Sequence, residues 1–278
     1  MSSKKRARKT RLAVPAGPAG SGFWDKIASG RVIFCAFTAA VLLFYAKPLF
    51  DYNASIQWDA VDVHYSSQKY FADHILSGRL PFWTPYLFSG FPFLADPQTG
   101  AWYPLNWPFF LTGITPRAIQ WELALHCLLA LAGGYLLARE ILKSRAAAVF
   151  AGVFFAFSGF FTGHSSHVGM FQTAALLPWL LWAGLRAVRS IRNVPILLVV
   201  AGCVVLPGHF QTALYSFFAL ALFLAARLRS AARVLAPNRA GAGCDRHGGV
   251  RALGGDGAAG IGTDRAIRAR QRGLQPWR

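Results

Sequence analysis

Long apolar runs separated by short polar segments dominate the chain. A membrane-spanning helix needs about 20 apolar residues, with about 17 as the lower bound. Three runs exceed that bound, the first reaches it if Lys47 extends to the interface, and the last two are marginal. Because almost no soluble sequence separates them, all six are expected to span. The pattern predicts an all-α, polytopic membrane helix bundle of about six transmembrane helices, at residues 32–50, 119–138, 146–163, 168–185, 194–206 and 212–226.

The distribution of the basic residues along the chain is more informative than the net charge itself. The 278 residues are 54% hydrophobic and 14% charged, yet carry a formal charge of +18. Seventeen basic residues lie in segments 1–31, 139–145, 186–192 and 227–233, whereas the other side has only Lys47, Lys69, Arg79 and Arg117. This is the positive-inside asymmetry. It predicts a multi-pass membrane protein with a cytoplasmic amino terminus, and it explains the basic residues without nucleic acid as a partner.

The long segment at residues 51–117 is expected to be exported and to carry the function. Ser66 or Ser67 can cap a short helix that runs through Leu76, with Gly78 as its stop. Phe71 and Ile75 fall on one face of that helix, which is typical of a helix lying in the membrane interface. Residues 81–110 contain eleven aromatic residues and six prolines, so no continuous helix is expected there.

Two interpretations of the aromatic stretch stay open. It could be an interfacial belt that packs on the bilayer, or a cleft of rings and carboxylates suited to a sugar or a lipid-linked sugar. Asp59 and Asp62 follow the first run beside Trp58 and His64. They could be solvated loop acids, or a general base and a divalent-cation ligand.

Several longer motifs resemble the bacterial YfhO family of membrane proteins. They are Trp58-Asp59, residues 78–92 (GRLPFWTPYLFSGFP), 94–100 (LADPQTG) with Tyr103-Pro104, the turn at 158–167 with 177–179 (LPW), and 208–215 (GHFQTALY). The resemblance covers roughly residues 32–233. It implies a GT-C-type glycosyltransferase that moves a sugar from a polyprenyl-phosphate carrier to an acceptor outside the membrane.

The resemblance also implies roles for individual residues. An acid in the first exported loop is the usual base or metal ligand of the GT-C class, which places Asp59 first and Asp62 second. A cation would stabilise the leaving phosphate, supplied by Lys69, Arg79 or a bound divalent metal on Asp59. Further expected contacts to the lipid-linked donor or the cell-envelope glycan acceptor are His64, Trp83, Asp96, His164, His167, His209 and Gln211. The alternative is a non-catalytic membrane protein that binds or moves lipid-linked glycans.

Weaker pairs have simpler explanations. His164 and His167 could share a metal or act as polar caps at the membrane surface. His209 and Gln211 could form a hairpin turn or the rim of the same cleft. Glu122 and His126 share a helix face, where an ionisable residue is a functional candidate, although the helix dipole explains Glu122 nearly as well.

The composition divides the chain into three parts. A basic cytoplasmic segment at 1–31 precedes the membrane domain at 32–233. The segment 234–278 is rich in Gly and Arg and almost free of aromatic residues. It is expected to be a disordered basic tail, or the product of a frame lost near Pro237, in which case the chain is an inactive amino-terminal fragment of a longer protein.

Overall fold

A computed structural model describes residues 29–56 and 58–235, and its regular elements are helices. The basic segment before residue 29 and the tail after residue 235 lie outside the described residues. The bundle contains α2 (Gly30–Phe44), α3 (Ala46–Phe50), α6 (Pro116–Leu142), α7 (Arg145–Ala156), α8 (Gly159–Gly163), α9 (Val168–Ala175), α10 (Leu177–Arg189), η4 (Ile191–Asn193), α11 (Val194–Val205) and α12 (Phe210–Leu235).

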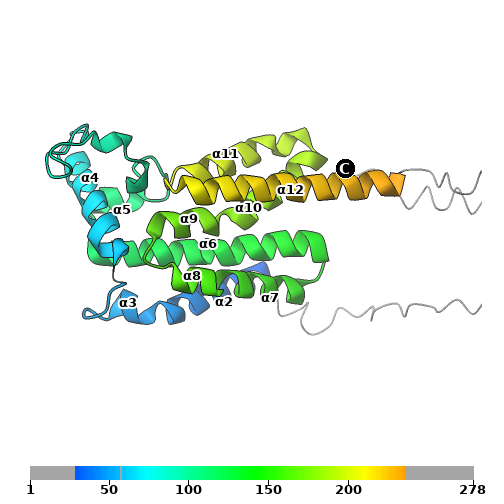
Figure 1. The fold of residues 1–278 in the computed structure, drawn as a ribbon. Helices are drawn as coiled ribbons and strands as arrows, with labels where there is room; N and C mark the ends of the chain where they lie inside the picture. The colour runs from blue at the N-terminus through cyan, green and yellow to red at the C-terminus, as the bar shows by residue number, and fades with distance from the viewer. Residues whose placement is uncertain (1–28, 57, 236–278) are drawn as a thin grey trace, which may run out of the picture.

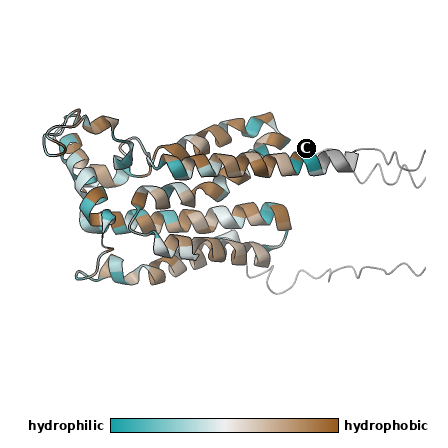
Figure 2. Cartoon of the chain, in the orientation of Figure 1, coloured by the Kyte–Doolittle hydropathy of each residue, from teal (hydrophilic) through white to brown (hydrophobic). Residues whose placement is uncertain are grey.

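The segment between α3 and α6, residues 51–115, forms a cap on one end of this bundle (Figure 1). Within the described part of the cap, the only strand pairing is an isolated antiparallel bridge between Thr84 and Phe91. Apolar residues cover most of the bundle, and hydrophilic residues gather in the cap (Figure 2). The cap elements are η1 (Ala60–Tyr65), α4 (Ser66–Leu76), η2 (Phe93–Ala95), η3 (Pro97–Thr99) and α5 (Trp107–Thr112).

Four of the described helical segments are long and apolar enough to cross a membrane: Pro116–Leu142, Arg145–Gly163, Val168–Arg189 and Phe210–Ser230. The protein is therefore an all-helical bundle embedded in a membrane. The first and fifth predicted spans correspond to shorter apolar helices, Gly30–Phe44 and Ile191–Val205. The first run is interrupted at Tyr45, where α2 ends and α3 begins. The count of six spans stays a prediction.

Helix α6 is the central element of the bundle, and small residues let its neighbours approach closely. A Cβ at Gly134 would lie 3.0 Å from the Cα of Gly152 on α7. A Cβ at Gly133 would meet the Trp179 ring of α10, whose Nε1 donates to the Leu129 carbonyl at 2.8 Å. Glycine at such crossings allows backbone contact between helices in a membrane. The crossings fix α7 and α10 on two sides of α6.

The cap confirms one local prediction and corrects another. Helix α4 ends at Leu76, and Gly78 follows in the left-handed region, as expected. However, Ser66 does not cap a helix start, because η1 runs directly into α4. The Ser66 hydroxyl instead donates to the Asp62 carbonyl. The apolar face of α4 is also not a membrane face: Phe71 is buried against the Phe110 ring of α5, at 4.9 Å between centroids.

A buried polar network joins the cap to the bundle. Gln68 of α4 and Gln172 of α9 each donate to Oε2 of Glu122, at 3.1 and 3.3 Å, and Gln172 also donates to Asn106. All four side chains are buried. This corrects the helix-dipole interpretation of Glu122, because the carboxyl group faces amides of the cap and of α9. These contacts hold the cap in one position over the bundle.

A second pair of buried residues completes this junction. His126 lies one turn after Glu122 and its Nδ1 is 2.6 Å from the Glu122 carbonyl. Because a carbonyl only accepts, Nδ1 carries the proton, and Nε2 accepts from the hydroxyl of Tyr103 at 2.8 Å. Burial raises the pKa of Tyr103, so that hydroxyl keeps its proton.

Candidate functional site

Asp59 and His167 meet where the cap joins the bundle. His167 Nε2 lies 3.5 Å from Asp59 Oδ2, and both side chains are about half exposed, at 46% and 52%. Ser166 Oγ lies 3.2 Å from the other ring nitrogen of His167. An exposed pair of this kind contributes little to stability. Its importance is chemical, because it puts an imidazole beside the carboxylate that the sequence singled out.

The backbone around Asp59 is unusual. Trp58 has a φ of 65°, which is rare for a residue other than glycine, and Asp59 leads into the π-helix η1. Strained residues and π-helical turns are both frequent at functional sites. In η1, Ala60 and His64 are buried, whereas Asp62 is exposed. The turn thus separates two aspartates only three residues apart.

A small central cavity of about 180 Å³ lies under the Asp59–His167 pair. It is where the cap meets the α8–α9 turn and the α11–α12 turn. Gly169 and Gly208 permit the close approach of these segments: a Cβ at 169 would lie 2.9 Å from the Pro207 carbonyl. The cavity is lined by Asp59, Val63, His64, Gln98, His167, Gly169, Met170, Pro207, Gly208 and His209.

The two other histidines of the central cavity are uncharged near neutral pH. Burial lowers the pKa of His64 to about 4, although the Asp59 carboxylate opposes this shift. Burial also lowers the pKa of His209. The Thr212 amide donates to His209 Nδ1 at 3.3 Å, so the proton of neutral His209 is on Nε2. The imidazole of His209 is therefore a fixed hydrogen-bond donor.

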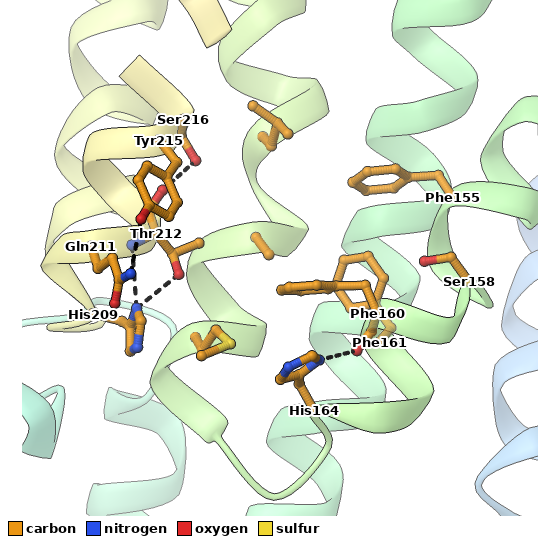
Figure 3. Close-up of a pocket in the computed structure, with 13 residues that line it drawn as sticks. Phe155, Ser158, Phe160, Phe161, His164, His209, Gln211, Thr212, Tyr215 and Ser216 are labelled. Carbon is orange, nitrogen blue, oxygen red and sulfur yellow. Dashed lines mark hydrogen bonds between the residues drawn. The ribbon is translucent and has the colours of Figure 1, made fainter. Parts of the chain in front are cut away.

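A lateral groove of about 400 Å³ runs beside the central cavity, with α8 on one side and α12 on the other (Figure 3). His164 and His209 flank its end nearest the cap, and Phe155 and Ser216 lie farther along it. The His164 ring stacks on Phe160, and its Nδ1 donates to the Phe160 carbonyl. The groove is lined by Phe155, Ser158, Phe160, Phe161, His164, Met170, Ala174, Leu177, His209, Gln211, Thr212, Tyr215 and Ser216.

An outer cavity of about 630 Å³ lies on the other side of the Asp59–His167 pair and is lined by Ile56, Trp58, Asp59, Gly163, Ser165, Ser166 and His167. The three cavities share lining residues. Asp59 and His167 belong to both the outer and the central cavity, whereas Met170 and His209 belong to both the central cavity and the lateral groove. They form a row from the lateral groove through the central cavity to the outer cavity. Asp59 lies at the boundary between the central and the outer cavity.

Two predicted cationic residues lie elsewhere. Lys69 pairs with Asp73 one turn along α4, which raises the pKa of Lys69, and both are exposed. Arg79 donates to the Ser77 hydroxyl just beyond the end of α4. Neither residue lines the three cavities, so the prediction that they meet the leaving phosphate finds no contact in the structure.

Three other predicted residues have local roles. Asp62 is exposed and lines none of the three cavities. Asp96 caps η3 by accepting from the Gln98 amide at 2.9 Å. The Trp83 ring covers Gly90, and its carbonyl accepts from the Tyr70 hydroxyl at 3.0 Å. By contrast, Asp59, His64, His164, His167, His209 and Gln211 all line the row of cavities.

The prediction of a divalent metal on Asp59 has no cluster of protein ligands to support it in the described part of the chain. Among the described residues, no group of three or more His, Cys, Asp or Glu side chains has an arrangement that could hold one. His164 and His167 do not converge on one point: their ring centroids are 5.9 Å apart, one ring lines the lateral groove and the other faces Asp59.

Sequence reasoning missed three residues of the central region: Gln98, Gly169 and Ser166. Gln98 had a signal, since it lies in the 94–100 motif. Ser166 had one too, since it lies in the 158–167 turn, whereas Gly169 had none, because its importance depends on which turn packs against it. No family model, curated protein or solved structure matches the chain.

Proposed function

We propose that this protein transfers a sugar from a polyprenyl-phosphate carrier to an acceptor hydroxyl on the capped side of the membrane. The observation that carries the proposal is the position of Asp59. It lies between an outer cavity at the capped end and a small cavity that adjoins a groove lined by residues of three candidate membrane spans. A lipid-linked donor needs both environments, one for its chain and one for its sugar. The resemblance to the YfhO family supports the same chemistry.

The proposed step assigns each substrate to one cavity. The lipid chain occupies the lateral groove, and the acceptor arrives through the outer cavity. Asp59 accepts the proton of the acceptor hydroxyl while the oxygen of that hydroxyl bonds to the anomeric carbon of the sugar. The bond from that carbon to the phosphate oxygen breaks, and its electron pair leaves with the lipid phosphate. His167 positions the carboxylate, and His209, which lines both the central cavity and the lateral groove, offers its Nε2–H to the leaving phosphate.

The test compares two neighbouring aspartates. The full chain is reconstituted in vesicles with a radiolabelled polyprenyl-phosphate hexose, and transfer to a membrane-impermeant glycan acceptor is measured. Asp59→Asn is expected to abolish transfer, because removing a general base costs about 10²- to 10⁴-fold. Asp62→Asn is the matched control, since Asp62 lines none of the cavities, and it should keep full activity. Full transfer by Asp59→Asn would contradict the proposal.

A second function is favoured by one observation. No Lys or Arg among the described residues lines the three cavities, so no fixed positive charge faces a leaving phosphate. A protein that binds or moves a lipid-linked glycan without cleaving it needs no such charge. In that case wild type and Asp59→Asn would bind the labelled donor equally, and neither would release labelled product.

A further inference from the structure

A fourth cavity, of about 380 Å³, lies apart from the proposed catalytic row. It is between the end of α3 and the start of α6, and its lining includes Tyr52, Ser55, Arg117 and Gln120. It shares no residue with the other three cavities. Because α6 is a candidate span that begins here, the cavity lies at the level where lipid head groups meet the bundle.

One side of this cavity is positively charged. The Arg117 guanidinium lies over the Tyr52 ring, 4.0 Å from its centroid, and Arg117 is only half-buried. The first turn of α6 contains no acidic side chain, and a helix amino terminus carries partial positive charge. Asp51 is near in sequence, but its carboxylate accepts a hydrogen bond from the backbone N–H of Asn53. An arginine in this setting is suited to a phosphate group.

The other side holds a buried acceptor without a donor. Gln120 is 1% exposed, and its Nε2 donates to Ser55 Oγ at 3.3 Å and to the Pro116 carbonyl at 3.4 Å. These bonds orient the amide and leave Oε1 with no hydrogen-bond partner. Buried polar atoms are normally paired, so an unpaired amide oxygen on a residue that lines a cavity points to a donor on a ligand.

An apolar surface adjoins this polar cavity. Phe50 at the end of α3 is 59% exposed and Trp121 on α6 is 38% exposed, and their rings meet edge to face with centroids 6.1 Å apart. Exposed aromatic residues at the end of a span are typical of the membrane–water interface. A ligand held between Arg117 and Gln120 can therefore continue along an apolar wall.

We propose that this cavity binds the head group of an anionic phospholipid. The phosphate contacts Arg117, a head-group hydroxyl donates to Gln120 Oε1, and the acyl chains lie along Phe50 and Trp121. Phosphatidylglycerol has both the phosphate and the hydroxyl donors, whereas phosphatidylcholine has the phosphate and no donor. The site is independent of sugar transfer.

The test measures lipid retention by native mass spectrometry of the full chain in detergent, with phosphatidylglycerol or phosphatidylcholine added. Wild type is expected to prefer phosphatidylglycerol. Arg117→Gln should weaken its binding about tenfold, the effect of losing one charge-assisted contact. Gln120→Leu should reduce the preference for phosphatidylglycerol. Arg79→Gln is the matched control, an exposed arginine of the cap outside the cavity, and should bind like wild type.

A second variant, at Tyr52, tests the role of Arg117 without removing its charge. Tyr52 is 89% exposed, so Tyr52→Ala leaves the fold intact while freeing Arg117, and it should also weaken phosphatidylglycerol binding. Equal binding of the two lipids, or unchanged binding by both Arg117→Gln and Tyr52→Ala, would overturn the proposal. Displacement of the bound lipid by millimolar inorganic phosphate would also overturn it, because a free anion would then suffice.

Discussion

Gly208 packs its backbone directly against the backbone of Pro97. A Cβ at position 208 would overlap the Pro97 carbonyl oxygen and lie 2.8 Å from the backbone nitrogen of Gln98. Gly208 also has a φ of 87°. Two requirements, left-handed backbone and no side chain, thus coincide at one position. The contact fastens the 94–100 segment of the cap to the turn that begins α12, and it encloses the central cavity.

Replacing Gly208 with alanine should loosen the cap. The left-handed backbone and the overlap with Pro97 together are expected to cost at least about 2 kcal/mol of unfolding free energy. Gly202→Ala is the matched control, because a Cβ there meets nothing within 4 Å and lies inside α11. That change should stabilise by about 0.5–1 kcal/mol. Thermal unfolding in detergent would measure both, and equal effects would contradict this packing.

Glu122 should tolerate glutamine but not alanine. Its Oε2 accepts from Gln68 and Gln172, while its Oε1 has no partner. A glutamine keeps one acceptor oxygen, and its neutral amide avoids the cost of burying a charge. Alanine leaves the Gln68 amide without an acceptor, removes one of the two acceptors of Gln172 and opens a void, which is expected to cost about 2–5 kcal/mol. Unfolding of the two variants in mixed micelles distinguishes them; similar losses would contradict the network.

Acidification should destabilise the protein through His64. Its pKa is about 4 in the folded chain and about 6.5 when unfolded, so the unfolded state binds more protons between these values. Stability is therefore present above pH 6.5 and falls as the pH decreases toward 4, with a loss of about 2 kcal/mol at pH 5. His64→Gln should remove this part of the pH dependence. An unchanged slope between pH 7 and 5 in that variant would refute the assignment.

Filling the lateral groove should exclude a lipid chain. Ala174 lines the groove between Met170 and Leu177, and Ala174→Leu would displace two or three methylene groups. At about 0.8 kcal/mol each, this lowers affinity by more than tenfold. Photolabelling with a polyprenyl phosphate that carries a diazirine on its chain would report the loss. Leu222→Phe, on the exposed surface of α12, is the control and should label like wild type.

Local patterns predicted local structure well. The apolar runs marked the bundle, since each helix needs a continuous stretch of apolar residues wherever it packs. Helix α4 and its stop at Gly78 were also predictable, because caps and left-handed glycines act within a few residues. The same reasoning was wrong about the apolar face of α4. Periodicity shows that Phe71 is hidden, but it does not show whether lipid or α5 hides it.

The candidate site was predictable only in part. Asp59 was chosen by its place after the first apolar run and by a family resemblance. Its neighbours His167 and His209 come from turns more than 100 residues away, and nothing local in the sequence states that these turns meet. Lys69 and Arg79 lie closer in the chain, yet Lys69 pairs with Asp73 along α4 and Arg79 bonds to Ser77 beyond its end.

The sequence alone determined that this chain is helical and membrane-embedded, because hydrophobic length and spacing act along the chain. Only the tertiary structure decided which polar residues share a cavity. Asp59, His64, His167 and His209 meet because Gly169 and Gly208 let separate turns approach, and Glu122 ties the cap to the bundle through Gln68 and Gln172. These contacts depend on shape complementarity between distant segments, which no local pattern records.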